Sequence, residues 1–287
     1  LVHGVTAAYG LTHDTGYLDI AKKQNQIILS GDGLKVAQAL DKNKQTPDVF
    51  KSVAFGDGND GKQGALVVMR TQTGGDQALL FKPAAQGLGH GHFDKLTWQF
   101  YDHGNEIVSD YGAARFLNVE AKYGGRYLPE NETYAKHTVA HNTVVIDETS
   151  HFNANVKVGN NNHPTLNFFE TNQYGTVSSG QISTAYKGVE LERTLALINL
   201  PMLESTLSVD IFNVTADSSH KIDLPLHYKG QLIDTSFELL GNTKSLAALG
   251  DKNGYQHLWL KAQAQPDEGL AKVTWLNDNG RFIHKQA

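Results

Sequence analysis

Two histidines separated by a single glycine begin the part of the sequence whose residue types could do chemistry. They are His90 and His92 in the run GHGHFD, where Asp94 follows closely. Imidazole nitrogens and carboxylate oxygens ligate metal ions, and imidazoles also move protons near neutral pH. The glycines beside His90 let a backbone come close to a ligand. The run therefore predicts a metal site, a substrate site or both, and histidines satisfied by backbone carbonyls are the alternative.

Further polar residues of this kind lie between residues 86 and 152, at the edges of predicted strands or in glycine-containing connections. They are Asp110, Arg115, Arg126, Tyr127, His141 and Asn142. A His-x-His pair on a strand would point both rings to one face, roughly 6–7 Å apart. Because the chain has no cysteine, a metal has to be bound by His, Asp or Glu. A His/His/Asp zinc site is compatible with the spacing, which equally allows separate structural histidines.

Tyr127 follows Arg126 directly in GGRYLPEN, and Arg115 lies shortly before them in YGAARF. A phenol has a pKa near 10, so it acts as a base only where positive charge stabilises the phenolate. The same arginines can bind a substrate carboxylate through two parallel hydrogen bonds. A core tyrosine beside surface arginines would leave the same pattern.

The elements that must position these residues fall into two groups. Residues 1–45 contain helical patterns, in GYLDIAKKQNQIIL and GLKVAQAL, and we interpret them as a helical remnant or linker. From Ala65 the apolar period changes to two, in runs such as ALVVMR, TLNFFE, VELERTLALI and YQHLWLKA. Many short strands without intervening helices predict a mainly β protein, with one large antiparallel β-sandwich over residues 46–287.

Composition limits the classes of partner. The net charge of −5 gives no reason to expect nucleic acid or an anionic membrane, and argues mildly against a sulfated polyanion. The sequence contains no run of about 18 apolar residues, so it predicts no membrane span. The absence of cysteine is compatible with a bacterial periplasmic or secreted protein. The first residues resemble the middle of a helix, so we expect the chain to be part of something longer.

Four motifs match a known family in order and separation. GLGHGHFDKLTWQFYDHG, SDYGAARFLNVE, GGRYLPEN and AHNTVVIDETSHF closely resemble the heparinase II/III-like module of the alginate lyases of polysaccharide lyase family 17. The resemblance runs from about residue 50 to at least residue 153 and continues more weakly through the later strands. It implies a heparinase II/III C-terminal-like sandwich, and residues 1–45 resemble the end of the helical toroid that precedes it.

The resemblance implies a metal site and separates the two histidines of the motif. In such enzymes a zinc ion is held by residues that correspond to His92, Asp110 and His141. It lies far from the reacting carbons, so the zinc would be structural. His90 would face the substrate cleft instead.

The resemblance also implies catalytic and substrate-binding residues. Tyr127 would be one of two catalytic tyrosines, with His90 beside it. Arg115 would contact a uronate carboxylate, and we expect Arg126 and Asn142 to bind substrate as well. The toroid of these enzymes donates an Asn-His pair and the second tyrosine. The missing toroid would therefore have to come from the same polypeptide or from a partner chain, and we predict that the isolated chain is weakly active or inactive.

The expected function is an alginate or oligoalginate lyase that cleaves by β-elimination and leaves 4,5-unsaturated uronates. The alternatives are a lyase for heparin, heparan sulfate or another uronic-acid polymer, a non-catalytic zinc-stabilised carbohydrate-binding sandwich, and a cupin-like metal sandwich. A homodimer is compatible with the sequence. Bond preference and exo or endo cleavage are left open.

Overall fold

The chain forms two compact units, Leu1–Lys51 and Ser52–Ala287. The computed structural model describes residues 1–47, 50–71, 77–87, 90–110, 128–199, 202, 206–242, 245–266, 269–277 and 280–286. The boundary between the units lies a few residues beyond the limit of about residue 45 that the sequence suggested. Each unit has its own apolar core and is described by itself.

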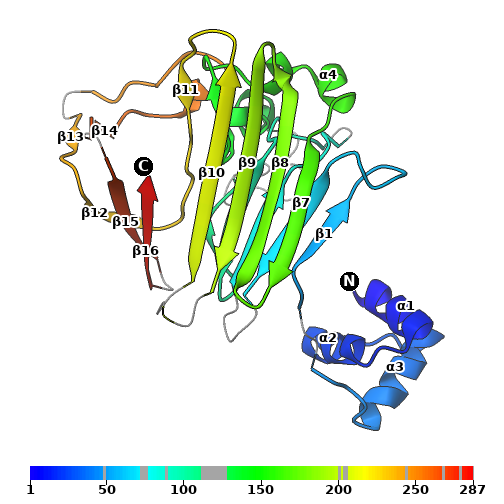
Figure 1. Ribbon diagram of the computed structural model, residues 1–287. Coiled ribbons are helices and arrows are strands. Elements are labelled where there is room, and N and C mark those ends of the chain that lie inside the picture. The colour runs from blue at the N-terminus through cyan, green and yellow to red at the C-terminus, as the bar shows by residue number, and fades with distance from the viewer. Residues whose placement is uncertain are drawn as a thin grey trace. The chain divides into compact units, whose positions relative to one another are not determined.

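The first unit is a small helical bundle (Figure 1). Its helices are α1 (Val2–Thr12), α2 (Gly16–Gln24) and α3 (Asp32–Asp41). Asp14 accepts a hydrogen bond from the backbone N–H of Gly16 at 2.9 Å and so satisfies a free donor at the start of α2. Its core consists of Tyr9, Leu18, Ala21, Val36 and Ala39.

The second unit begins with an antiparallel sheet in the strand order β1-β2-β3-β4-β5. These strands are β1 (Val53–Gly56), β2 (Ala65–Arg70), β3 (Gln77–Lys82), β4 (Thr97–Asp102) and β5 (Asn105–Val108). Leu79 and Phe81 point inward and are fully buried, so Leu80 and Lys82 point to the outer face. On β4, Gln99 lies opposite Leu80 and Thr97 opposite Lys82.

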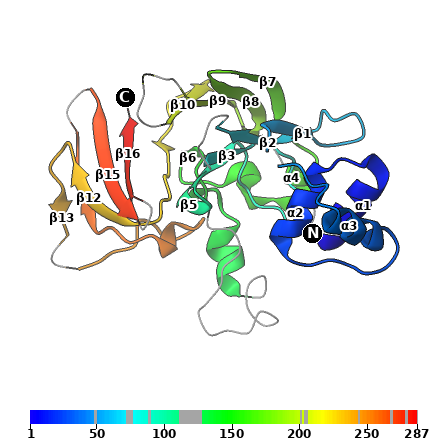
Figure 2. The same ribbon diagram turned by 90° about the horizontal axis from the view of Figure 1, so that it is seen from below.

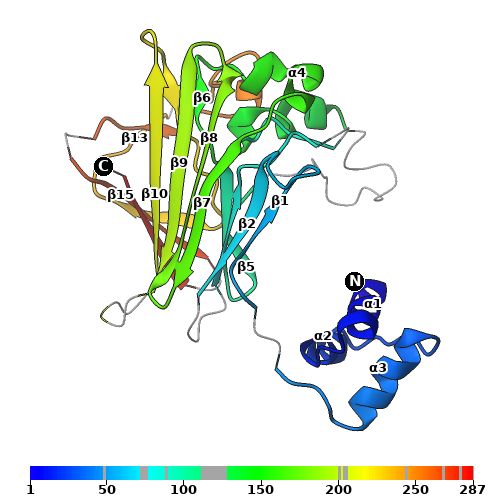
Figure 3. The ribbon, with the colours of Figure 1, turned by 45° about the vertical axis from the view of Figure 1, so that its right-hand side comes forward.

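A second antiparallel sheet, in the order β10-β9-β8-β7, packs against the first (Figures 1 and 3). Its strands are β7 (Thr165–Asn172), β8 (Gly175–Tyr186), β9 (Val189–Ile198) and β10 (Leu207–Ala216). Leu191, Leu195 and Leu197 of β9 are buried against Phe81 and Met69 of the first sheet in one continuous core. The two layers therefore form a sandwich.

Shorter elements complete this unit (Figure 2). The helical turns are η2 (Asn131–Ala135), η3 (Thr138–Ala140), η4 (His151–Ala154), α4 (Val156–Asn160) and η5 (Tyr255–His257). The remaining strands are β6 (Val145–Ile146), β11 (Ile222–Asp223), β12 (Gln231–Thr235), β13 (Leu240–Gly241), β14 (Ala262–Gln263), β15 (Ala271–Asn277) and β16 (Gly280–Gln286). They pair as β11-β6, β13-β14 and β12-β15-β16, and Trp275 of β15 joins the main core.

The predicted fold class, a mainly β protein with an antiparallel sandwich, is confirmed. The strand predicted in YQHLWLKA is only partly correct: the run begins with the turn η5, Trp259 forms an isolated antiparallel bridge with Ala248, and Ala262 begins β14. Tyr255, the first residue of this turn, is buried and its hydroxyl donates to Asp223 at 2.5 Å. In the part of the chain that the structure describes, no helix is both long and apolar enough to span a membrane.

Candidate metal and substrate site

The two histidines of the motif lie in the connection between β3 and β4, not on a strand. His92 is half-buried and His90 is exposed. A Cβ atom on Gly91 would lie 1.7 Å from the carbonyl oxygen of Gln86, so only glycine fits there. This glycine therefore serves the packing of the loop, whereas we expected it to admit a ligand.

Buried hydrogen bonds fix this loop to the segment that carries His141. The hydroxyl of Thr138 donates to the carbonyl of Phe93 at 2.6 Å, and the hydroxyl of Thr143 donates to the carbonyl of Lys95 at 2.7 Å. These threonines flank His141 in the chain. Two segments far apart in the sequence are thereby held side by side.

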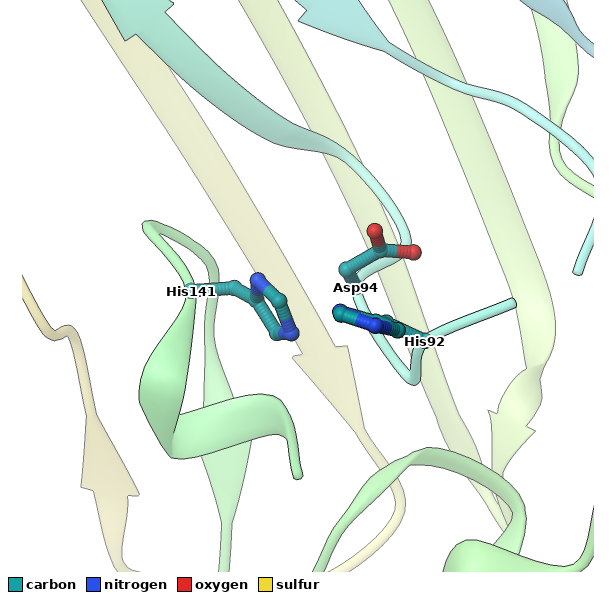
Figure 4. A group of neighbouring side chains, drawn as sticks. All are labelled: His92, Asp94 and His141. Carbon is teal, nitrogen blue, oxygen red and sulfur yellow. The ribbon is translucent and has the colours of Figure 1, made fainter. Parts of the chain in front are cut away.

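His92, Asp94 and His141 form a group that could hold a metal ion (Figure 4). One ligand atom of each lies within 4.8 Å of the others. The two imidazole rings have centroids 5.2 Å apart and are tilted by 47°. A His/His/Asp set of this kind is a donor set that zinc accepts.

The hydrogen bonding of His141 fits a metal ligand. His141 is fully buried and its Nδ1 lies 2.9 Å from Oδ2 of Asp110, while Nε2 has no hydrogen-bond partner. Among the residues that the structure describes, nothing pairs with this nitrogen; a buried polar atom without a partner is costly, and a metal ion would satisfy it. A carboxylate on the other ring nitrogen is the usual support of a metal-bound histidine.

The role of Asp110 as a direct ligand stays a prediction. The structure brings His92 and His141 together as expected, but Asp94 completes the group, and Asp110 contacts His141 through a hydrogen bond. Asp110 in this arrangement orients the imidazole. Asp94 is therefore a further candidate ligand beside the predicted Asp110.

Asp94 is a buried carboxylate between two ammonium groups. It forms ion pairs with Lys82 and with Lys95, the latter at 3.4 Å. Burial opposes its charged form, but the two lysines outweigh this effect and hold the pKa of Asp94 well below its usual range. Asp94 is thus a permanent negative charge beside the imidazoles.

His92 is an uncharged imidazole at neutral pH. Burial, followed by repulsion from His141, lowers the pKa of His92 to about 4. A neutral imidazole has a free lone pair, which metal binding requires.

A pocket of about 250 Å³ opens beside this group on the outer face of the first sheet. Leu66 and Leu80 provide apolar walls, and Lys82 and Gln99 provide polar ones. His90 lies at this pocket together with His92, Asp94 and Asp110. Ligand pockets are commonly about 300–1,000 Å³, so this one is small for a complete ligand.

Asn142 does not line this pocket among the described residues, and its role in substrate binding stays a prediction. It is fully buried, and its side-chain nitrogen donates to the carbonyls of Trp98 at 2.9 Å and Ser109 at 2.7 Å. Its side-chain oxygen accepts from the N–H of His227 at 2.6 Å. The whole amide is used inside the sandwich.

Three predicted residues, Arg115, Arg126 and Tyr127, lie outside the described residues. Their roles stay predictions. The described part of the site is therefore the metal group and the pocket with His90.

The sequence did not identify three buried charged residues near the histidines, Asp94, Lys95 and Arg193, as parts of the site. Asp94 carried a signal, because it stands two residues after His92 in the same run. Arg193 also carried one, since it occupies an inward position between Leu191 and Leu195 in an alternating strand. Lys95 gave no signal, because a lysine in a loop is normally exposed.

Comparisons with known proteins agree on one family. A family model described as "Heparinase II/III-like, C-terminal" matches residues 56–286. The chain is 48% identical over 280 residues to an exo-oligoalginate lyase of Saccharophagus degradans, which covers 97% of this chain and 38% of the relative. It is 46% identical over 282 residues to an alginate lyase of Stenotrophomonas maltophilia, covering 98% of this chain and 38% of the relative.

Solved structures of more distant enzymes also overlap with the chain. A heparan sulfate lyase, HepC, from Pedobacter heparinus aligns with a TM-score of 0.49 at 15% identity, over 85% of this chain and 32% of that one. A heparinase III aligns with a TM-score of 0.48 at 13% identity, over 88% of this chain and 45% of that one.

Proposed function

Because this chain belongs to the heparinase II/III-like, C-terminal family, we propose that it forms the β-sandwich part of an alginate lyase. The observation that carries the proposal is the identity of 48% and 46% to two relatives named for cleavage of alginate, over almost the whole chain. The chain spans 38% of the length of these relatives. We propose that residues beyond this span complete the catalytic centre.

The reaction is a β-elimination on a uronate. A base removes the proton from C5, the bond between C4 and its oxygen breaks, and a C4–C5 double bond forms as that oxygen takes up a proton. The carboxylate on C5 has to be neutralised while negative charge develops beside it. The enzyme therefore needs a cation, a base and an acid.

We assign these tasks to residues at the pocket and to the segment outside the described residues. Tyr127 is the base, with His90 and Arg115 assisting at the carboxylate. Arg126 contributes a further cation. The acid that protonates the leaving oxygen is assigned to a helical module in the same polypeptide or in a partner chain.

The metal is proposed to be zinc with a structural role. His92 and His141, with Asp94 or Asp110, would hold it, and it would supply positive charge and tie the motif loop to the segment of His141. The lyase step itself is assigned to protein side chains.

The helical unit supports the expectation of a further helical module. Its core is small, and Leu11 and Leu29 are 84% and 75% exposed. Exposed leucines are compatible with a covering module, although the proposal itself depends on the relatives, of whose length this chain spans 38%. We propose that this module belongs to the same polypeptide or to a partner chain, and that the protein works in the periplasm or outside the cell.

The test is an assay for the conjugated double bond. The chain is incubated with polymannuronate, polyguluronate and heparin, alone and fused to the part of the Saccharophagus relative that it does not span. We expect ultraviolet absorbance to rise on alginate with the fused protein and little or none with the chain alone. A fused protein that is inactive on all uronates, or active on heparin only, contradicts the proposal.

Matched substitutions distinguish an enzyme from a sugar-binding module. Tyr127→Phe should lower turnover by roughly 10²–10⁴-fold, the usual contribution of a positioned base, and leave affinity for alginate oligosaccharides intact. Tyr174→Phe, at an exposed tyrosine between β7 and β8, is the control. Equal turnover in both variants would remove Tyr127 from the mechanism.

A further inference from the structure

A buried arginine crosses the core of the sandwich. Arg193 of β9 is 1% exposed, and its Nε and Nη2 donate to Oδ1 and Oδ2 of Asp210 at 2.8 and 2.6 Å. Its guanidinium also lies 4.6 Å from the ring of Phe212 and 5.9 Å from the ring of Trp98. The charge is therefore paired and enclosed by aromatic faces.

The remaining nitrogen of Arg193 bridges the two segments that carry the histidines. Nη1 donates to the carbonyl of Leu96 at 2.8 Å and to the carbonyl of Asn142. Leu96 ends the loop that contains His92, and Asn142 follows His141 directly. One side chain of the second sheet thus holds both loops from behind.

Asn142 extends this network to Asp110. Its backbone N–H donates to the hydroxyl of Thr97 at 3.0 Å, and its side chain donates to the carbonyl of Ser109 at 2.7 Å. Ser109 immediately precedes Asp110, which accepts from Nδ1 of His141 at 2.9 Å. The residue next to His141 therefore fixes the backbone of the carboxylate that orients His141.

Stability alone does not account for this arrangement. Buried ion pairs are often no more stabilising than apolar side chains of similar volume. Leu191, Leu195 and Leu197 surround Arg193 on the inward face of β9, so an apolar residue would fit the pattern there. What an apolar residue could not provide is the hydrogen bonding to both loops.

We propose that Arg193 and Asn142 are positioning residues that hold His141 and Asp110 in register and thereby set the affinity of the site for a divalent metal. The inference rests on the proposed metal site. Metal ligands tolerate displacements of only about 0.2 Å, and groups behind the ligands commonly change metal affinity by about 10–100-fold.

The first test measures zinc affinity by competition with a chelator, at a temperature where each variant is folded. Asn142→Ala and Arg193→Met are each expected to weaken zinc binding by about 10–100-fold. The matched control is Leu195→Ala, which removes a buried neighbour of Arg193 on the same strand and should lower stability without changing affinity. Unchanged affinity in Asn142→Ala, or an equal loss in Leu195→Ala, overturns the proposal.

The second test does not need the metal. In the metal-free protein, ¹⁵N NMR of the imidazoles should show His141 with its proton on Nδ1, because Asp110 accepts there. Asn142→Ala and Arg193→Met should lose this tautomer preference, and Leu195→Ala should keep it. If the wild type binds no zinc, the metal site fails, whereas an unaltered tautomer in both network variants refutes the positioning role itself.

Discussion

Two lysines, Lys82 and Lys95, form ion pairs with Asp94, and a ligand can reach the ammonium group of Lys82. Its side chain is 36% exposed at the pocket, whereas the side chain of Lys95 is fully buried. Burial works against the charge of Lys82, but Asp94 more than offsets this and raises the pKa of Lys82. A lysine has three donors, so the ion pair with Asp94 leaves others for a uronate carboxylate.

Replacing Lys82 should therefore weaken substrate binding in the fused protein, in which the chain is joined to the part of the Saccharophagus relative that it does not span. A hydrogen bond to a charged group contributes about 1.5 kcal/mol, so Lys82→Gln should raise KM for alginate oligosaccharides by roughly tenfold. Lys82→Arg should stay close to the wild type. Lys229→Gln is the control, because Lys229 is 62% exposed and pairs with Glu106 instead of Asp94. A KM that does not change would place the uronate elsewhere.

His151 should make the chain sensitive to acid. It is fully buried, and burial, followed by the charge of Lys95, lowers the pKa of His151 to about 3. In the unfolded chain the pKa returns to about 6.5. Between these values the unfolded state binds the extra proton, so stability present above about pH 6.5 is lost as the pH falls, by about 1.4 kcal/mol per unit for this one group.

Urea unfolding at several pH values between about 7 and 4.5 measures this loss. His151→Gln keeps an acceptor for the N–H of Lys95, which His151 Nδ1 accepts at 3.2 Å, and does not titrate. As the pH falls, the free energy of unfolding of this variant should therefore decrease less steeply than that of the wild type. The two slopes should differ by about 1.4 kcal/mol per pH unit, the effect of one proton. Parallel curves for the two proteins would show that His151 titrates normally in the fold.

At the scale of the elements, the loop between β3 and β4 depends on one glycine. A Cβ on Gly91 would lie 1.7 Å from the carbonyl oxygen of Gln86 and 2.3 Å from that of Gly87, and backbone atoms cannot yield as a flexible side chain can. Gly91→Ala should destabilise the chain by more than about 1 kcal/mol and weaken zinc binding, since His92 is the next residue. Gly241→Ala, where a Cβ meets nothing within 4 Å, is the control for calorimetry and zinc titration.

The elements also show how far the sequence predicts the site. Alternation places β2 and β9 correctly, because the inward face of each strand has to be apolar, whereas in β7 a bulge between Leu166 and Phe168 interrupts it. The sequence motifs predict that His92 and His141 lie together. The residues that hold these histidines in place depend on how distant segments align, which the motifs do not show. Arg193 bonds to Leu96 across 97 positions of the chain, and no local pattern encodes that contact. Nothing in the sequence indicated that the amide of Asn142 is hydrogen-bonded to Trp98, Ser109 and His227, which are all distant in the chain.

At the scale of the whole molecule, a metal at His92 and His141 would join the motif loop to the segment that leads into β6. Strand β6 pairs with β11, so the metal would connect parts of the sandwich that lie far apart in the chain. A ligand that binds only the folded state at about 1,000 times its Kd stabilises it by about 4 kcal/mol. For a unit of this size that corresponds to a rise in Tm of roughly 10 °C.

Thermal unfolding after chelation and after readdition of zinc should show this rise for the wild type and none for His92→Ala. His163→Ala is the control, because His163 is an exposed histidine outside the metal group and should leave the full response to zinc. The helical unit has its own core, so its transition should not respond to zinc in any of these proteins. A wild-type Tm that ignores zinc would mean that Nε2 of His141, which has no partner among the described residues, is satisfied by something other than a metal.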